Sequence, residues 1–153
     1  MIFQQLHSYA LPYSISNLVA LALLFLALRF PVVARIVLGI IFLLASIVNA
    51  REAILQPSSY LFYEQVALLP VYRDFIAGWF SDHVRAMVLP IAFGQLLIAV
   101  GMFVRGIWLK LSIVGVVTFG LAIAPLGIGS AFPCSIVLAI AATQLWPRSD
   151  VMS

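Results

Sequence analysis

Long apolar runs separated by short polar breaks dominate the hydropathy pattern of this chain. A helix needs roughly 17 to 25 apolar residues to cross a bilayer, and four runs reach that length: 12–30, 32–50, 86–104 and 107–124. A fifth run, 132–146, is shorter. We therefore expect an all-α polytopic transmembrane helix bundle with five spans, namely a four-helix core plus an N-terminal span. If the first run instead lies on the membrane surface, the bundle has four spans.

One long segment, 51–85, lies outside these runs and forms a connector between the second and third spans. Residues 60–69 can form a short helix that ends before a proline, as helices tend to do. A second short helix with one apolar face follows, because apolar residues recur there at helical spacing. Those residues are Phe75, Ile76, Trp79 and Phe80. The pattern predicts an interfacial helical connector that caps the external mouth of the bundle.

The composition supports a membrane protein with a single domain, 1–153. Apolar residues make up 65% of the chain and charged residues only 8%, against about 45–50% and 25% in soluble domains. With a mean hydropathy of +1.19, too few polar groups remain to cover a water-facing surface, so most of the exterior must contact the lipid bilayer. The net charge of +3 includes no basic run, and this excludes nucleic acid as an expected partner.

The basic residues divide unequally between the two predicted sides of the membrane. One side holds five of them and the other holds three, and basic residues favour the cytoplasmic side. We therefore expect the N-terminus outside and the C-terminus in the cytoplasm, with the inverted orientation as the alternative. The larger group is Arg29, Arg35, Arg105, Lys110 and Arg148, and the smaller is Arg51, Arg73 and Arg85.

Most side chains that could bind a ligand or take part in catalysis fall on the predicted external side. Tyrosine, histidine and carboxylate groups gathered there could bind a quinone head group, a lipid head group or a small solute. The competing interpretation is an aromatic belt with a solvated loop, because tyrosine and tryptophan favour membrane interfaces for amphipathic reasons alone. The candidate ligand-binding residues are Tyr60, Tyr63, Glu64, Tyr72, Arg73 and His83, together with Gln95 inside the third span.

Gln95 is the central polar residue of the predicted spans. It could bond across to another helix, for instance to Asn49 or Ser46, or it could contact a ligand; helix packing is the commoner role. No acidic residue or histidine lies within the spans. This argues against a proton pump or an ion-coupled transporter, which need ionisable groups inside the membrane.

A metal or haem centre is not favoured by the pattern. His7 and His83 fall on the same predicted side, as two axial ligands of an iron would. Neither lies inside a span, however, and no second ligand follows either one at helical spacing. Cys134 is the only cysteine, so neither an internal disulfide nor a cysteine-rich metal site is available. We predict no metal and no cofactor, with quinone as the open alternative.

Several stretches resemble the DoxX-like family of small bacterial and archaeal membrane proteins. They are Arg35-Ile-Val-Leu-Gly-Ile-Ile-Phe, the long aromatic connector, Gly94-Gln95-Leu-Leu-Ile-Ala and Pro125-Leu-Gly-Ile-Gly-Ser-Ala-Phe-Pro. The resemblance covers about Arg35 to Trp146. It implies a four-helix bundle in a cell membrane, sometimes linked to quinone-coupled sulfur oxidation or to redox-defence complexes. The family offers no catalytic motif that could be carried over residue by residue.

The functional expectation is an accessory or binding subunit of a larger membrane redox or energy-converting complex, without catalytic activity of its own. Such a role requires a protein partner or a homo-oligomer. One alternative is a quinone-linked oxidoreductase subunit with an external pocket. The other is a transporter of small solutes or lipids.

Overall fold

The computed structural model describes residues 2–130 and 132–148, and within them every regular element is a helix, so the all-α prediction is confirmed. Long helices form the body of the protein: α1 (Ile2–Arg29), α2 (Pro31–Leu55), α5 (Ser81–Phe103), α6 (Ile107–Ile123) and α7 (Cys134–Thr143). Short elements connect them: η1 (Pro57–Leu61), α3 (Phe62–Val66), α4 (Pro70–Phe75), the π-helical η2 (Ile76–Phe80), η3 (Ala124–Ser130) and η4 (Trp146–Arg148).

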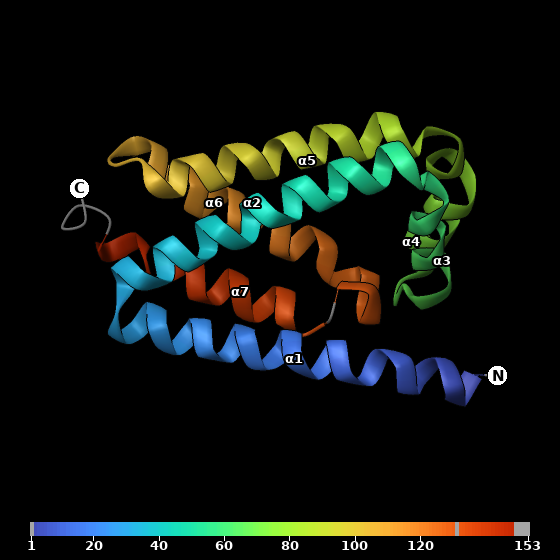
Figure 1. Cartoon of the computed structure of the whole chain (residues 1–153), viewed down its shortest axis with the longest axis horizontal. Coiled ribbons are helices and arrows are strands. Elements are labelled where there is room, and N and C mark those ends of the chain that lie inside the picture. Colours follow the sequence, from blue (N-terminus) through green and yellow to red (C-terminus); the bar gives the residue numbers. More distant parts are fainter. Residues whose placement is uncertain (1, 131, 149–153) are drawn as a thin grey trace.

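The long helices lie side by side along one axis, and the chain reverses direction between them (Figure 1). α5 packs along α2, and α7 packs between α1 and α6. α3 and α4 fold over the end at which α2 finishes and α5 begins, and we call this the connector end. We call the opposite end, where α1 meets α2 and α5 meets α6, the turn end.

Local sequence explains where the helices change direction. Phe30 precedes a proline, a position that disfavours helical backbone, and its φ of −135° and ψ of 68° separate α1 from α2. Pro31 then occupies the first turn of α2, where its missing N–H costs nothing. Between α5 and α6, Gly106 has a φ of 68°, a backbone conformation that only glycine adopts readily. Four of the five basic residues expected on one side belong to helices that meet at this turn end, and Arg105 lies in the turn between α5 and α6.

Three helical stretches are long and apolar enough to cross a membrane. They are Pro31–Leu55, Pro70–Phe103 and Ile107–Gly127, with hydropathies of 2.5, 2.1 and 2.0, and Tyr13–Arg29 is a shorter apolar helix. These helices mark the chain as a multi-pass membrane protein. α7 has 10 residues and rises about 15 Å, roughly half of a hydrocarbon core. The five-span arrangement therefore stays a prediction.

The expected bounds match α6 closely and differ elsewhere. α2 continues to Leu55 and α5 begins at Ser81, because polar residues outside the hydrocarbon region can extend a helix whose backbone they do not interrupt. α1 begins at Ile2 rather than at Pro12. A proline within a membrane helix is tolerated where neighbouring groups satisfy the freed carbonyl.

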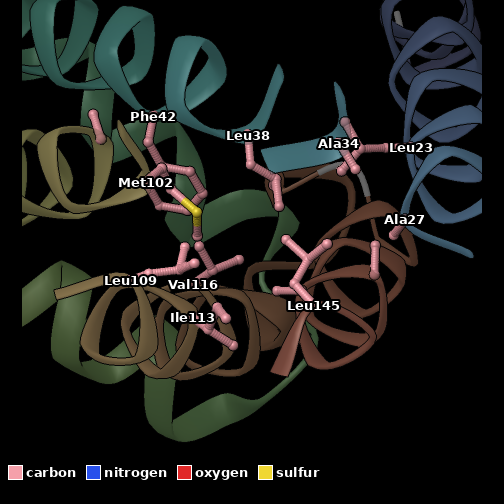
Figure 2. Close-up of a cluster of buried hydrophobic side chains, with 13 residues drawn as sticks. Leu23, Ala27, Ala34, Leu38, Phe42, Met102, Leu109, Ile113, Val116 and Leu145 are labelled. Atoms are coloured by element: carbon pink, nitrogen blue, oxygen red, sulfur yellow. The ribbon is translucent and has the colours of Figure 1, made fainter. Parts of the chain in front are cut away.

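Two apolar clusters fill the interior at different depths. The larger cluster lies toward the turn end and joins side chains of all five long helices; Figure 2 shows Leu23, Leu38, Met102, Ile113 and Leu145 among them. The smaller cluster lies at the connector end. It contains Ala53, Ile76, Phe80, Val84 and Val88.

A layer of polar bonds separates the two clusters along the contact between α2 and α5. Ser46 Oγ donates to the backbone oxygen of Ala92 at 2.7 Å, and Asn49 Nδ2 donates to Gln95 Oε1 at 2.8 Å. Gln95 is 2% exposed. The prediction that Gln95 bonds to Asn49 on a neighbouring helix is confirmed, whereas Ser46 bonds to backbone instead.

The outer surfaces of the long helices are apolar. Phe93, Leu97 and Val100 on α5 are more than half exposed, as are Leu44, Ile47 and Val48 on α2. A soluble monomer rarely exposes a continuous apolar surface of this extent. The surface is compatible with contact to lipid.

Small residues allow α6 and α7 to approach closely. A Cβ atom added at Gly120 would lie 2.6 Å from the backbone oxygen of Ser135, whereas one added at Gly94 would meet nothing within 4 Å. Gly120→Ala should therefore push α6 and α7 apart and lower the free energy of unfolding by about 1–3 kcal/mol, the usual effect of overpacking. Gly94→Ala is the matched control and should leave stability unchanged or slightly raised. Thermal unfolding in detergent measures both, and equal effects would contradict the close contact.

Candidate functional site

At the connector end, Arg85 holds the end of α2. Its Nε donates to the backbone oxygen of Ala53 at 3.2 Å and its Nη2 to that of Ile54 at 3.0 Å. The last carbonyls of a helix have no partner within the helix, and a cation there also interacts favourably with the helix dipole. Arg85 therefore fixes the start of α5 against the end of α2.

The connector also donates hydrogen bonds to backbone oxygens at the end of α6 and in the segment that follows it. The backbone nitrogen of Leu68 donates to the oxygen of Pro125 at 2.8 Å, and Tyr72 Oη donates to the oxygen of Ala122 at 2.9 Å. Gly127 has a φ of 64°, and a Cβ atom there would lie 2.7 Å from the backbone oxygen of Val66. The connector and η3 are thus in direct contact, and Tyr72 is part of that contact.

Arg73 and Tyr63 likewise act within the connector. Arg73 Nε donates to the oxygen of Ala67 at 2.8 Å and so caps α3. The ring of Tyr63 packs where a Cβ atom on Gly129 would lie, and its centroid is 6.1 Å from that of Tyr60. Burial raises the pKa of the Tyr63 phenol. Glu64, by contrast, is exposed.

Tyr60 continues the polar layer to the connector end. Its hydroxyl donates to Asn49 Oδ1 at 2.9 Å, and the Asn49 amide in turn donates to Gln95. Burial, followed by the proximity of Tyr63 and of the Glu52 carboxylate, raises the pKa of Tyr60 to about 12. The line Tyr60–Asn49–Gln95 therefore joins η1, α2 and α5 through side chains alone.

His83 lies apart from these contacts. Its ring stacks on Trp79 with centroids 4.4 Å apart and planes at 3°, and its Nδ1 lies 2.8 Å from the backbone oxygen of Trp79. The four apolar residues near the end of the connector do not share one environment as expected. Ile76 and Phe80 are buried, whereas Phe75 and Trp79 are 39% and 54% exposed. Neighbouring residues of a helix point about 100° apart, so Phe75 and Trp79 form one row and Ile76 and Phe80 the next, and the second row faces the interior.

The candidate residues therefore do not converge on one pocket. A cavity of about 70 Å³ lies beside Gln95 and is lined by α2, α5, α6 and α7, including the hydroxyl-bearing Ser135. Pockets for drug-sized ligands measure about 300–1,000 Å³, so this cavity is too small for a quinone ring. Gln95 thus contributes a bond between α2 and α5, and its role as a ligand contact stays a prediction.

A larger polar groove, of about 490 Å³, lies between η1 and the start of α5. Five polar residues line it: Ser58, Ser81, Asp82, His83 and Arg85. Of these, the sequence pointed to His83 alone as a ligand-binding candidate. Asp82 and Arg85 lie three residues apart, but the backbone of His83 between them is not helical, with φ −123° and ψ 23°, so helical spacing in the sequence could not have placed them together.

Among the described residues, no group of three histidine, cysteine or carboxylate side chains could hold a metal ion. His83 has only Asp82 as a neighbouring carboxylate in the groove. The side chain of His7 lies outside the described part of the chain.

The chain matches no family model, and no curated protein or solved structure is significantly similar to it. The resemblance to the DoxX-like family therefore stays an expectation from the sequence motifs.

The bond between Asn49 and Gln95 can be measured with a double-mutant cycle. Gln95→Leu should lower stability, because the Asn49 amide would lose its acceptor in an apolar interior. Asn49→Leu should do the same, and the double variant should lose less than the sum of the two. The coupling should be about 0.6–2 kcal/mol, the range for bonds between membrane helices. Additive losses in thermal unfolding would contradict a direct bond.

The raised pKa of Tyr60 predicts a loss of stability in alkaline solution. An unfolded tyrosine titrates near pH 10, whereas Tyr60 in the fold titrates at about 12. The fold binds the phenol proton more tightly, so this stabilisation is present below pH 10 and is lost as the pH rises to 12. Tyr60→Phe should therefore lose less stability than the wild type between pH 10 and 12. Both proteins should respond alike between pH 7 and 9, and an identical alkaline response would contradict the assignment.

Proposed function

We propose that this chain is an accessory subunit that binds within a larger membrane redox or energy-converting assembly and supplies no catalytic group of its own. The proposal rests on one observation, which is that polar side chains at the connector end form hydrogen bonds within the protein itself. Tyr60, Tyr72 and Arg73 each bond to the protein's own backbone or side chains. Their hydrogen bonds hold helix ends together, so these three side chains do not converge on a common ligand. The redox setting rests on the sequence resemblance alone.

The connector supplies a surface on which a protein partner can dock. Phe75 and Trp79 are stacked, with ring centroids 5.9 Å apart, and both are exposed. Behind them Ile76 and Phe80 belong to the buried cluster at the connector end. Exposed aromatic side chains on a rigid base lose little conformational freedom on binding, and tryptophan is enriched among residues that dominate interfaces.

Native isolation of the tagged chain with mass spectrometry tests this function. The proposal expects a constant protein partner and no stoichiometric flavin, haem or quinone absorbance from the chain alone. Trp79→Ala should weaken partner binding by about 30-fold, since loss of an interface hot spot commonly costs 2 kcal/mol or more. Trp108→Ala, which removes an equally exposed tryptophan at the turn end, should leave the partner bound.

Two further variants separate this function from the quinone-linked alternative. Glu64→Gln and His83→Gln should leave partner retention unchanged. If either variant abolished quinone-dependent turnover while assembly stayed intact, the oxidoreductase alternative would replace the accessory role. A chain that isolates only with copies of itself would replace the hetero-complex by a homo-oligomer.

A further inference from the structure

The polar groove between η1 and the start of α5 holds two opposite charges that do not pair with each other. Asp82 and Arg85 both line it, yet the ion pair found among the described residues is Arg51–Glu52, at 3.1 Å. His83, which lies between them, has a non-helical backbone with φ −123° and ψ 23°, so Asp82 and Arg85 do not follow the three-residue spacing of a regular helix. The separation of these two charges leaves room for a ligand that carries both signs.

Arg85 is held in place by the protein itself. Its Nε and Nη2 bond to the carbonyls at the end of α2, which leaves Nη1 to donate elsewhere. A guanidinium fixed by backbone bonds loses little freedom when it binds a phosphate, and its planar donors suit phosphate oxygens. The hydroxyl of Ser58 lines the same groove and can donate to the same group. The Asp82 carboxylate, which has no ion pair within the described part, can accept from an ammonium.

An apolar strip leads away from the groove along α5. The strip consists of exposed side chains at spacings of three and four residues, namely Ala86, Leu89 and Phe93. Val100, also exposed, continues it toward the turn end. Residues at these spacings lie on one side of a helix. A molecule whose polar head occupies the groove can thus lay hydrocarbon chains along the membrane-facing side of α5.

We propose that the groove lined by Ser58, Asp82 and Arg85 binds the head group of a phospholipid that carries a phosphate and a primary ammonium, as phosphatidylethanolamine does. The phosphate contacts Arg85 and Ser58, and the ammonium contacts Asp82. The groove of about 490 Å³ lies within the size range of small-molecule sites. This site is independent of the proposed accessory role, because it requires no protein partner.

The test is lipid binding to the purified, delipidated chain, measured by native mass spectrometry with short-chain lipids. The wild type should bind phosphatidylethanolamine about 10-fold or more tightly than phosphatidylglycerol, which has no ammonium, since a hydrogen bond to a charged group is typically worth this much. It should also prefer phosphatidylethanolamine to phosphatidylcholine, whose methylated ammonium has no N–H to donate. Equal binding of the three lipids would overturn the proposal.

Asp82→Asn is the decisive variant, because the exposed side chain of Asp82 holds no other element in place and the variant should fold. It should lose the preference for phosphatidylethanolamine over phosphatidylglycerol. Asp74→Asn removes an exposed carboxylate of the connector outside the groove and should keep that preference. An unchanged preference in Asp82→Asn would overturn the proposal.

Arg85→Lys tests the phosphate contact while retaining the positive charge. It should weaken the binding of phosphatidylethanolamine and of phosphatidylglycerol alike. Arg51→Lys, outside the groove, is the matched control and should leave the binding of both lipids unchanged. Free phosphoethanolamine distinguishes a lipid site from a site for a soluble phosphate compound. It should compete only weakly, because it lacks the chains that lie along α5, and competition at the affinity of the lipid would overturn the lipid assignment.

Discussion

The unpaired carbonyls at the helix ends are the constraint on which this fold depends. An α-helix leaves its last carbonyls unpaired, and an unpaired polar backbone group in an apolar surrounding is costly. The chain meets this constraint with side chains from distant elements. Arg85 bonds to the end of α2, Tyr72 bonds near the end of α6, and Arg148 bonds to Ala27 and Leu28 at the end of α1.

These bonds explain why the connector is a structured cap rather than a free loop. Its short helices are too small to be stable alone, because isolated helices below about 12 residues are marginal in water. They persist where Tyr72 and the backbone of Leu68 bond to the segment after α6, and where Ile76 and Phe80 enter the buried cluster. The connector is therefore stabilised by the bundle, and the bundle is closed by the connector.

The sequence predicted the parts of the fold that follow from hydrophobicity and from proline. The all-α bundle and a break between the first two helices near Pro31 follow from local patterns, and Asn49 was one of the partners considered for Gln95. The burial of Ile76 and Phe80 and the exposure of Phe75 and Trp79 could not be predicted, because residue spacing does not say which side of a short helix packs on the bundle.

The candidate site was predicted less well, for a related reason. Side-chain type identified Tyr60, Tyr72 and Arg73 as chemically capable, but their use depends on which carbonyl each one reaches in three dimensions. Arg85 was used only to predict the orientation of the chain in the membrane, although it both bonds to the end of α2 and lines the polar groove. A basic residue near the end of a membrane helix can thus set orientation in the membrane or bond to a neighbouring helix, and the sequence alone does not tell which.

The polar layer between α2 and α5 also fixes how far one helix is shifted along the other. Two apolar helices in lipid can slide past each other at little cost, since leucine packs on lipid as well as on leucine. Sliding by one turn, about 5.4 Å, would break the bonds of Ser46 and Asn49 together. The two bonds therefore fix the register of α5 along α2, and a shift of one helix along the other would have to break both of them.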